Sequence, residues 1–157
     1  MLKEYLTIVI WIFIALCLAR PARADDWKPI DRADLDMKAP IVEKDADAEG
    51  IFWERRVEDK WDGSRDQRVT RNYVRIKIFT DRGKEAYSTI DLEYQPPASI
   101  GDISGRTIKP DGSILELKKQ DVFDRTLVKA GGIKIKAKSF ALPSVEPGAV
   151  IEYRWRE

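Results

Sequence analysis

Apolar and polar residues alternate along most of the chain from Ile51 onward. In residues 51–61, Ile51, Trp53, Val57 and Trp61 share one parity, and charged residues hold most of the other. A period of two predicts strands with one buried face. The same alternation recurs in residues 68–80, 86–94, 100–109, 114–117, 133–136 and 151–155, whereas residues 123–128 are ambiguous. No sustained helical period follows residue 24.

Turn residues separate these segments. Pro110-Asp111-Gly112 is the strongest turn, because proline presets φ and glycine takes the left-handed conformation. Pro147-Gly148 introduces the last strand, Gly131-Gly132 makes another turn, and Thr80–Gly83 is expected to close a hairpin with Gly83 at positive φ. About seven strands at intervals of roughly ten residues favour an all-β fold, an antiparallel β-sandwich.

The N-terminus has the pattern of a secretory signal peptide. Lys3 precedes an apolar run over residues 6–18, which as a helix reaches about 20 Å and falls short of a bilayer core. Ala22 and Ala24 then form a small-x-small cleavage site before Asp25. We expect residues 1–24 to form a signal helix that is removed, with export to the periplasm or the extracellular space and no membrane span afterwards. The alternative is an uncleaved anchor.

Residues 25–49 are expected to form an acidic linker ahead of a β-sandwich domain at residues 50–157. The segment is rich in acidic residues, contains Pro29 and Pro40, and offers little apolar surface to offset its ordering. A short helix near residues 45–49 is the one element it suggests.

The composition excludes several chemistries. The chain has no histidine, and its only cysteine, Cys17, lies in the predicted signal peptide. Thiol nucleophiles, histidine-containing triads and zinc sites are therefore not expected. The net charge is +1, which provides no global attraction to nucleic acid. We expect no cofactor and no catalytic residue.

Some polar and aromatic residues still suggest sites. Trp53 and Trp61 share a strand face and make a candidate sugar-stacking platform, although packing is the commoner role of such rings. Acidic residues suggest calcium binding or, alternatively, a solvated surface. They are Asp34 with Asp36, Asp45 with Asp47, and Asp59 with Asp62 and Asp66.

Two further groups have simpler alternatives. Asp111 with Glu116, or Asp121 with Asp124, could form an acid–base pair, but Asp111 is better explained as a turn residue. The stripe Lys134, Lys136 and Lys138 could contact an anionic polymer, but an edge strand protected by lysines is favoured.

Three blocks carry a resemblance to a bacterial family. They are residues 75–83 (RIKIFTDRG), 106–113 (RTIKPDGS) and 140–153 (FALPSVEPGAVIEY). In order and spacing they resemble domain-of-unknown-function family 3857 (DUF3857), the exported module that usually precedes a transglutaminase-like domain. The resemblance implies an all-β module with no assigned activity, in which Pro110, Asp111, Gly112, Pro147 and Gly148 shape turns. It also implies that the sandwich is incomplete at the C-terminus, because family members continue with more strands.

The sequence therefore predicts a non-catalytic exported module associated with transglutaminase-like proteins. A transglutaminase-like domain or an envelope protein is the expected partner. A carbohydrate-binding module using the tryptophans and an unrecognised carboxylate hydrolase are the alternatives. Ile151, Tyr153 and Trp155 form one apolar face of the last strand. We expect that strand to leave an open edge through which copies associate.

Overall fold

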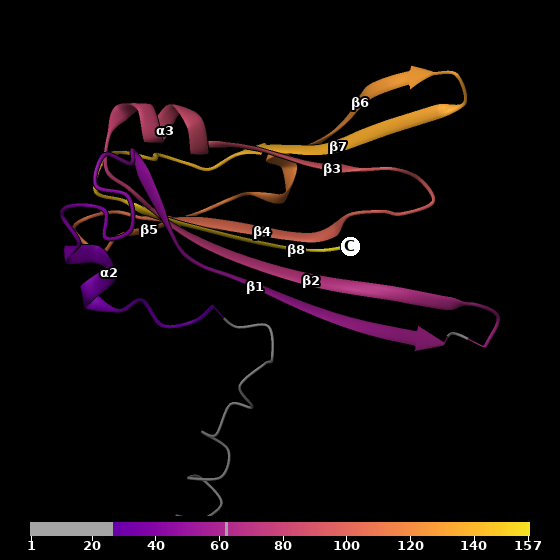
Figure 1. Ribbon diagram of the computed structural model, residues 1–157, viewed down its shortest axis with the longest axis horizontal. Helices are drawn as coiled ribbons and strands as arrows, with labels where there is room; N and C mark the ends of the chain where they lie inside the picture. Colours follow the sequence, from indigo (N-terminus) through magenta and orange to yellow (C-terminus); the bar gives the residue numbers. More distant parts are fainter. Residues whose placement is uncertain (1–26, 62) are drawn as a thin grey trace, which may run out of the picture.

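The computed structural model describes residues 27–61 and 63–157, so the predicted cleavage residues Ala22, Ala24 and Asp25, and also Asp62, lie outside the described residues. Eight strands in the described part form two antiparallel sheets (Figure 1). The larger sheet has the order β1-β2-β8-β4-β5 and the smaller sheet the order β3-β7-β6. The strands are β1 (Ala48–Trp61), β2 (Asp66–Ile78), β3 (Thr89–Tyr94), β4 (Gly101–Ile108), β5 (Ile114–Glu116), β6 (Val122–Ala130), β7 (Ile133–Ala141) and β8 (Val150–Arg156).

The predicted antiparallel sandwich is confirmed, with eight strands rather than about seven. The ambiguous residues 123–128 belong to β6, which pairs with β7 around the predicted turn at Gly131-Gly132. Both of these glycines have positive φ. The two layers lie one above the other in Figure 1, and the β1–β2 and β6–β7 hairpins diverge at the same end of the sandwich.

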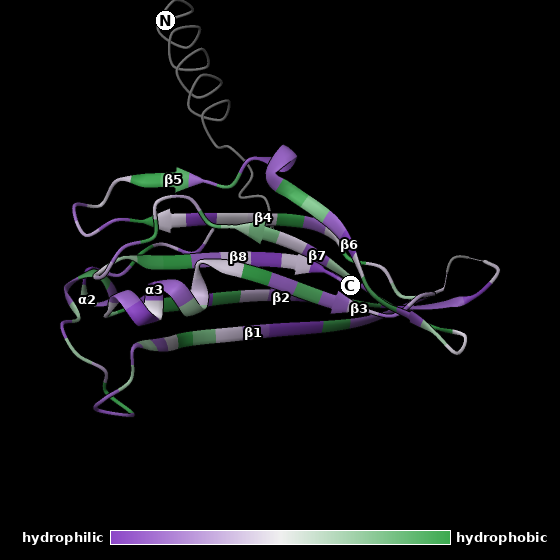
Figure 2. Ribbon diagram, turned by 90° about the horizontal axis from the view of Figure 1, so that it is seen from above, coloured by the Kyte–Doolittle hydropathy of each residue, from purple (hydrophilic) through white to green (hydrophobic). Residues whose placement is uncertain are grey.

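The hydrophobic core lies between the two sheets. On β2, Val74, Ile76 and Ile78 face the smaller sheet, and the residues between them face outward. This alternation is visible along the strands in Figure 2. The buried core residues are Val74, Ile76, Ile78, Ile90, Leu92, Ile100, Phe140, Leu142, Val145 and Ile151.

Strand β8 lies in the middle of the larger sheet. It pairs with β2 on one side and with β4 on the other. Ile151 is fully buried, while Tyr153 and Trp155 pack against the core. The expected open edge is therefore wrong, and self-association through it loses its basis. The alternation predicted which face of each strand is buried but not which strands become neighbours.

Residues 80–83 do not close a hairpin. The Thr80 hydroxyl accepts a hydrogen bond from the Gly83 backbone N–H at 3.1 Å and caps helix α3 (Asp81–Tyr87). Gly83 is thus helical and lacks the predicted turn role. It is needed for a close approach, because a Cβ atom there would lie 2.2 Å from the carbonyl oxygen of Asp47.

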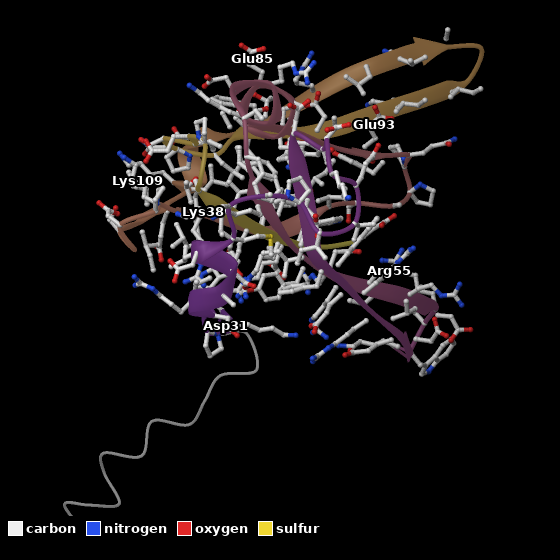
Figure 3. The ribbon with its side chains drawn as sticks, turned by 60° about the vertical axis from the view of Figure 1, so that its left-hand side comes forward. Asp31, Lys38, Arg55, Glu85, Glu93 and Lys109 are labelled. Atoms are coloured by element: carbon white, nitrogen blue, oxygen red, sulfur yellow. The ribbon has the colours of Figure 1, made fainter. Side chains whose placement is uncertain are left out.

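The N-terminal segment is not a free linker. It contains helix α2 (Arg32–Asp36), capped by Asp31, and it lies against the outer face of the larger sheet (Figure 1). Figure 3 shows Asp31 and Glu85 of α3 on opposite sides of the sandwich. The suggested helix near residues 45–49 is replaced by the start of β1 at Ala48. The remaining helix is a short 3-10 turn, η1 (Lys119–Asp121).

Candidate functional site

A buried cluster of charges occupies the centre of the larger sheet. The register places Glu152 of β8 opposite both Arg75 of β2 and Arg106 of β4. Arg75 Nε donates to Glu152 Oε1 at 2.7 Å, and Arg106 Nε donates to Oε2 at 2.5 Å. The Tyr73 hydroxyl donates to Glu152 Oε1 at 2.5 Å. Glu152 is 0% exposed, so its charge is balanced by these donors instead of water.

The cluster shifts the titration of its members. Burial alone would lower the pKa of Arg75, but its hydrogen bonds to Glu152 and Asp34 outweigh that effect and raise the pKa above its usual value. Burial and the hydrogen bond to Glu152 raise the pKa of Tyr73. Burial lowers the pKa of Lys77, which lies two residues after Arg75 on the same face of β2. Arg75 therefore stays charged, and Tyr73 stays a proton donor at neutral pH.

Residues 27–37 cover this cluster, and we call them the N-terminal strap. Asp34 accepts a hydrogen bond from Arg75 Nη1 at 2.8 Å. Lys77 Nζ donates to the carbonyl oxygen of Leu35 at 2.8 Å and to that of Gly148 at 2.7 Å. The contacts are polar, and the sheet face beneath them is buried: Lys77 is 1% exposed.

Trp27 anchors the N-terminal end of the strap. The guanidinium of Arg154 lies 4.4 Å from its ring centroid and that of Arg106 lies 4.6 Å away. The ring also packs edge-on against Tyr73 at 5.5 Å. Two cations on one indole make this a strong cation–π site.

A charged groove of about 470 Å³ continues from this end of the strap. Its basic side chains are paired with acidic ones: Arg71 with Glu58 at 2.7 Å, and Arg156 with Asp102 at 3.0 Å. Lys28 pairs with Glu54 in the same groove. The full lining is Lys28, Glu54, Arg56, Glu58, Arg71, Asn72, Tyr73, Asp102, Arg154, Trp155 and Arg156.

A second groove, of about 370 Å³, is aromatic and apolar. Trp53, Tyr87, Tyr153 and Trp155 contribute to its lining together with aliphatic residues of β2. Tyr153 and Trp155 stack at 5.7 Å with an interplanar angle of 16°. Burial, together with the nearby Tyr87, raises the pKa of Tyr153.

The structure separates the two predicted platform tryptophans. Trp53 is 66% exposed in the aromatic groove, and its indole N–H donates to the side-chain oxygen of Asn72 at 3.3 Å. Trp61 is 65% exposed and ends β1, eight residues further along. The two rings therefore lie far apart along the same strand, and Trp53 lines the aromatic groove whereas Trp61 lies near the end of the β1–β2 hairpin.

Further apolar side chains are exposed on the diverging hairpins. They are Val57 and Trp61 on β1, and Phe123, Leu127, Val128 and Ile133 on β6 and β7.

The predicted turn residues take structural roles. Gly112 and Gly148 have φ of 85° and 88°. The Asp111 carboxylate accepts from the Ser113 N–H at 2.8 Å and from its hydroxyl at 2.6 Å, which lowers the pKa of Asp111. A Cβ atom on Gly148 would lie 3.1 Å from Pro110 Cγ, so the Pro110–Gly112 and Pro147-Gly148 turns pack together.

Four of the acidic candidates are counter-ions of neighbouring cations. Asp34 binds Arg75, Asp36 binds Arg32, Asp47 binds Arg82 and Asp59 binds Arg68. Among the described residues, no group of three or more histidine, cysteine, aspartate or glutamate side chains is arranged to hold a metal ion.

The lysine stripe does not protect an edge, because β7 is the middle strand of the smaller sheet. Lys136 and Lys138 lie 3.6 and 2.6 Å from the carboxylate of Asp124. The hydrogen bond from Lys138 is the main cause that lowers the pKa of Asp124. Tyr94 also donates to Asp124, at 3.1 Å, so this carboxylate is the centre of a small polar cluster.

The fold and these surfaces define the class of protein: an antiparallel β-sandwich with two surface grooves and a strap over a buried charge cluster. In the described part of the chain, no helix is long and apolar enough to cross a membrane. Residues 64–157 match the family model of DUF3857, a domain of unknown function with a solved structure. The chain belongs to the DUF3857 family, which confirms the resemblance.

One solved structure shows a similar fold. It is a "putative protease" from Parabacteroides distasonis, with a TM-score of 0.50 and 19% sequence identity. The match covers 57% of this chain and 19% of that chain, so this chain corresponds to a small part of a much longer protein. At this identity the likeness shows the fold alone. No curated protein matches the chain.

Proposed function

We propose that this chain is a non-catalytic, exported interaction module that packs against a neighbouring protein domain. The observation that carries the proposal is the apolar surface of the diverging hairpins. Trp61 is 65% exposed at the end of β1 and Ile133 is 51% exposed at the start of β7, so both lie at the tips of the two hairpins that diverge at the same end of the sandwich (Figure 1). Single exposed apolar residues are ordinary, but apolar residues gathered at one end of a molecule favour an interface.

Export and the identity of the partner rest on the sequence. The signal-peptide pattern of residues 1–24 supports export to the periplasm or the extracellular space. The family resemblance supports a transglutaminase-like domain as the partner. The similar fold in a much longer protein supports a role as one module of a larger architecture.

A non-catalytic role is supported by the residues that are present. The sequence has no histidine, and Cys17 lies in the predicted signal peptide. In each suggested acid–base pair, Asp111 with Glu116 and Asp121 with Asp124, one carboxylate is engaged elsewhere: Asp111 in its turn, and Asp124 with two lysines. No observation favours the carboxylate-hydrolase alternative.

The test is binding to a purified transglutaminase-like domain taken from a DUF3857 protein, measured by isothermal titration calorimetry. Trp61→Lys and Ile133→Lys should each weaken binding at least tenfold, a change of about 1.4 kcal/mol. Ile114→Lys is the matched control, since Ile114 is 50% exposed on β5, the far edge of the larger sheet. Equal binding by all three variants, or no binding by the unmodified chain, would contradict the proposal.

A second candidate function is glycan binding in the aromatic groove. The favouring observation is that Trp53 is largely exposed although Asn72 holds its indole in place. A fixed, exposed ring beside Tyr87 and Trp155 suits stacking against a sugar. Soluble peptidoglycan fragments should then change the tryptophan fluorescence, and Trp53→Ala should abolish that change while Trp61→Ala keeps it. Loss of the signal in both variants, or in neither, would count against this candidate.

A further inference from the structure

The strap is held to the larger sheet mainly through its backbone. Arg75 Nη2 donates to the carbonyl oxygens of Lys28 and Pro29 at 3.2 and 3.0 Å. Arg106 Nη2 donates to the carbonyl oxygen of Lys28 at 3.3 Å, and the Lys28 backbone N–H donates to the Tyr73 hydroxyl at 3.2 Å. Such contacts recognise an extended chain whatever its side chains are.

Three side chains add selectivity. Lys28 forms an ion pair with Glu54 of β1. Trp27 contacts the guanidinium groups of Arg106 and Arg154, and Asp34 forms an ion pair with Arg75. The strap therefore binds as a peptide with an aromatic residue at one end and a carboxylate seven residues later. Main-chain hydrogen bonds supply affinity and a few side-chain contacts supply specificity, as in other peptide-binding domains.

The charge of the sheet face fits an acidic ligand. Arg75, Arg106 and Lys77 lie on this face, and Glu152 is the one buried carboxylate that the sheet itself contributes among the described residues. The face thus carries excess positive charge, which the strap offsets through Asp34 and its carbonyl oxygens. An uncovered face would attract a carboxylate-bearing peptide.

The residues of the strap are less buried than those of the face it covers. None of its side chains is fully buried, and α2 contributes no buried residue. Residues 38–45, which connect the strap to β1, are mostly exposed. Segments with few buried apolar contacts open locally at a lower free energy than the core does.

We propose that the outer face of the larger sheet is a binding site for an acidic peptide that is extended at its N-terminal end and forms a short helical turn around its carboxylate, and that the N-terminal strap occupies this site in cis. When the strap opens, a peptide of the same chemistry takes its place on Arg75, Arg106 and Lys77. The proposed function rests on the exposed apolar residues of the hairpins, which are not part of this site, so this inference does not depend on it.

The test uses the full chain and a labelled peptide with the sequence of residues 27–37, WKPIDRADLDM. Trp27→Ala combined with Asp34→Asn loosens the strap, and fluorescence anisotropy should show at least tenfold tighter peptide binding to this double variant than to the unmodified chain. Trp27→Ala combined with Asp36→Asn is the matched control, because Asp36 pairs with exposed Arg32 and leaves Asp34 on the sheet. It should bind the peptide more weakly than the first double variant does.

The peptide has its own controls. The peptide with Trp27→Ala and Asp34→Asn should lose binding, whereas the peptide with Asp36→Asn should keep it. Binding should weaken as salt increases, since it depends on ion pairs. Equal binding of the peptide to both protein variants and to the unmodified chain would overturn the proposal, as would a folded first variant that binds no peptide.

Hydrogen exchange of the unmodified chain provides a second measurement that needs no variant. Backbone amides of residues 28–37 should exchange at least about 100-fold faster than those of β2 and β8, because the strap opens without global unfolding. Exchange of the strap at the same rate as the central strands would show that it is an integral part of the domain and would overturn the proposal.

Discussion

Replacing Glu152 by glutamine isolates the energetic role of the buried charge cluster. The substitution keeps the size of the side chain and removes its negative charge. Glu152 accepts hydrogen bonds from Arg75, Arg106 and Tyr73 and is fully buried. The glutamine amide would turn N–H donors toward a guanidinium that also donates, so at least one guanidinium would lose its acceptor.

The magnitude follows from burial. Breaking a buried ion pair by removing one partner costs about 3–5 kcal/mol, because the remaining charge is left without compensation. A domain of this kind has a total free energy of unfolding of about 5–15 kcal/mol. Asp34 still faces Arg75 in the variant, so we place the loss at the lower end, about 3 kcal/mol.

Urea unfolding followed by tryptophan fluorescence measures this loss. Glu58→Gln is the control, because Glu58 and Arg71 form a pair of the same type at the same 2.7 Å distance but on the surface. Exposed pairs contribute about 0–1 kcal/mol. Similar losses in Glu152→Gln and Glu58→Gln would refute the argument that burial makes the Glu152 cluster essential to stability.

Two other predictions follow from local geometry. Gly83→Ala should destabilise the protein by about 1–3 kcal/mol, because its Cβ atom would meet the carbonyl oxygen of Asp47 and this overpacking outweighs the helix preference of alanine. Gly50→Ala, with open space around it, should have little effect on the midpoint of urea unfolding, and equal shifts in both variants would contradict the explanation. Because burial and Glu152 raise the pKa of Tyr73 in the folded state, the unfolded chain loses this proton first as the pH rises past about 10. The free energy of unfolding should therefore fall between about pH 9 and about pH 11 more steeply in the unmodified chain than in Tyr73→Phe, and parallel slopes would disprove the assignment.

The alternation of apolar residues predicted the sandwich well, because each strand's buried face depends on local periodicity. It did not predict the order of strands. The apolar face of Ile151, Tyr153 and Trp155 is compatible with an edge strand or a central one, and the register with β2 and β4 makes it central. The same limit applies to β7, whose lysines suggested an edge although the strand lies in the middle of the smaller sheet.

The candidate site was harder to predict, since its parts come from distant segments. Arg75 and Glu152 were placed in strands by their alternation, and their outward parity suggested solvent exposure. The strap changes this, because Trp27 and Asp34 cover a face that the sequence marks as polar. The low hydrophobicity of residues 25–49 suggested a linker. Only the geometry shows that their backbone carbonyls and one carboxylate can accept hydrogen bonds from buried cations.

Strand β8 explains why the two faces of the larger sheet can be studied separately. Its successive residues point to opposite sides, so Tyr153 and Trp155 line the aromatic groove while Glu152 holds the charge cluster. The free energy of contacts on the apolar face depends on the apolar area removed from water. The free energy of contacts on the charged face depends on ion pairs and their hydrogen bonds. Contacts that respond to salt therefore belong to the strap side, and contacts that survive high salt belong to the groove and the hairpins.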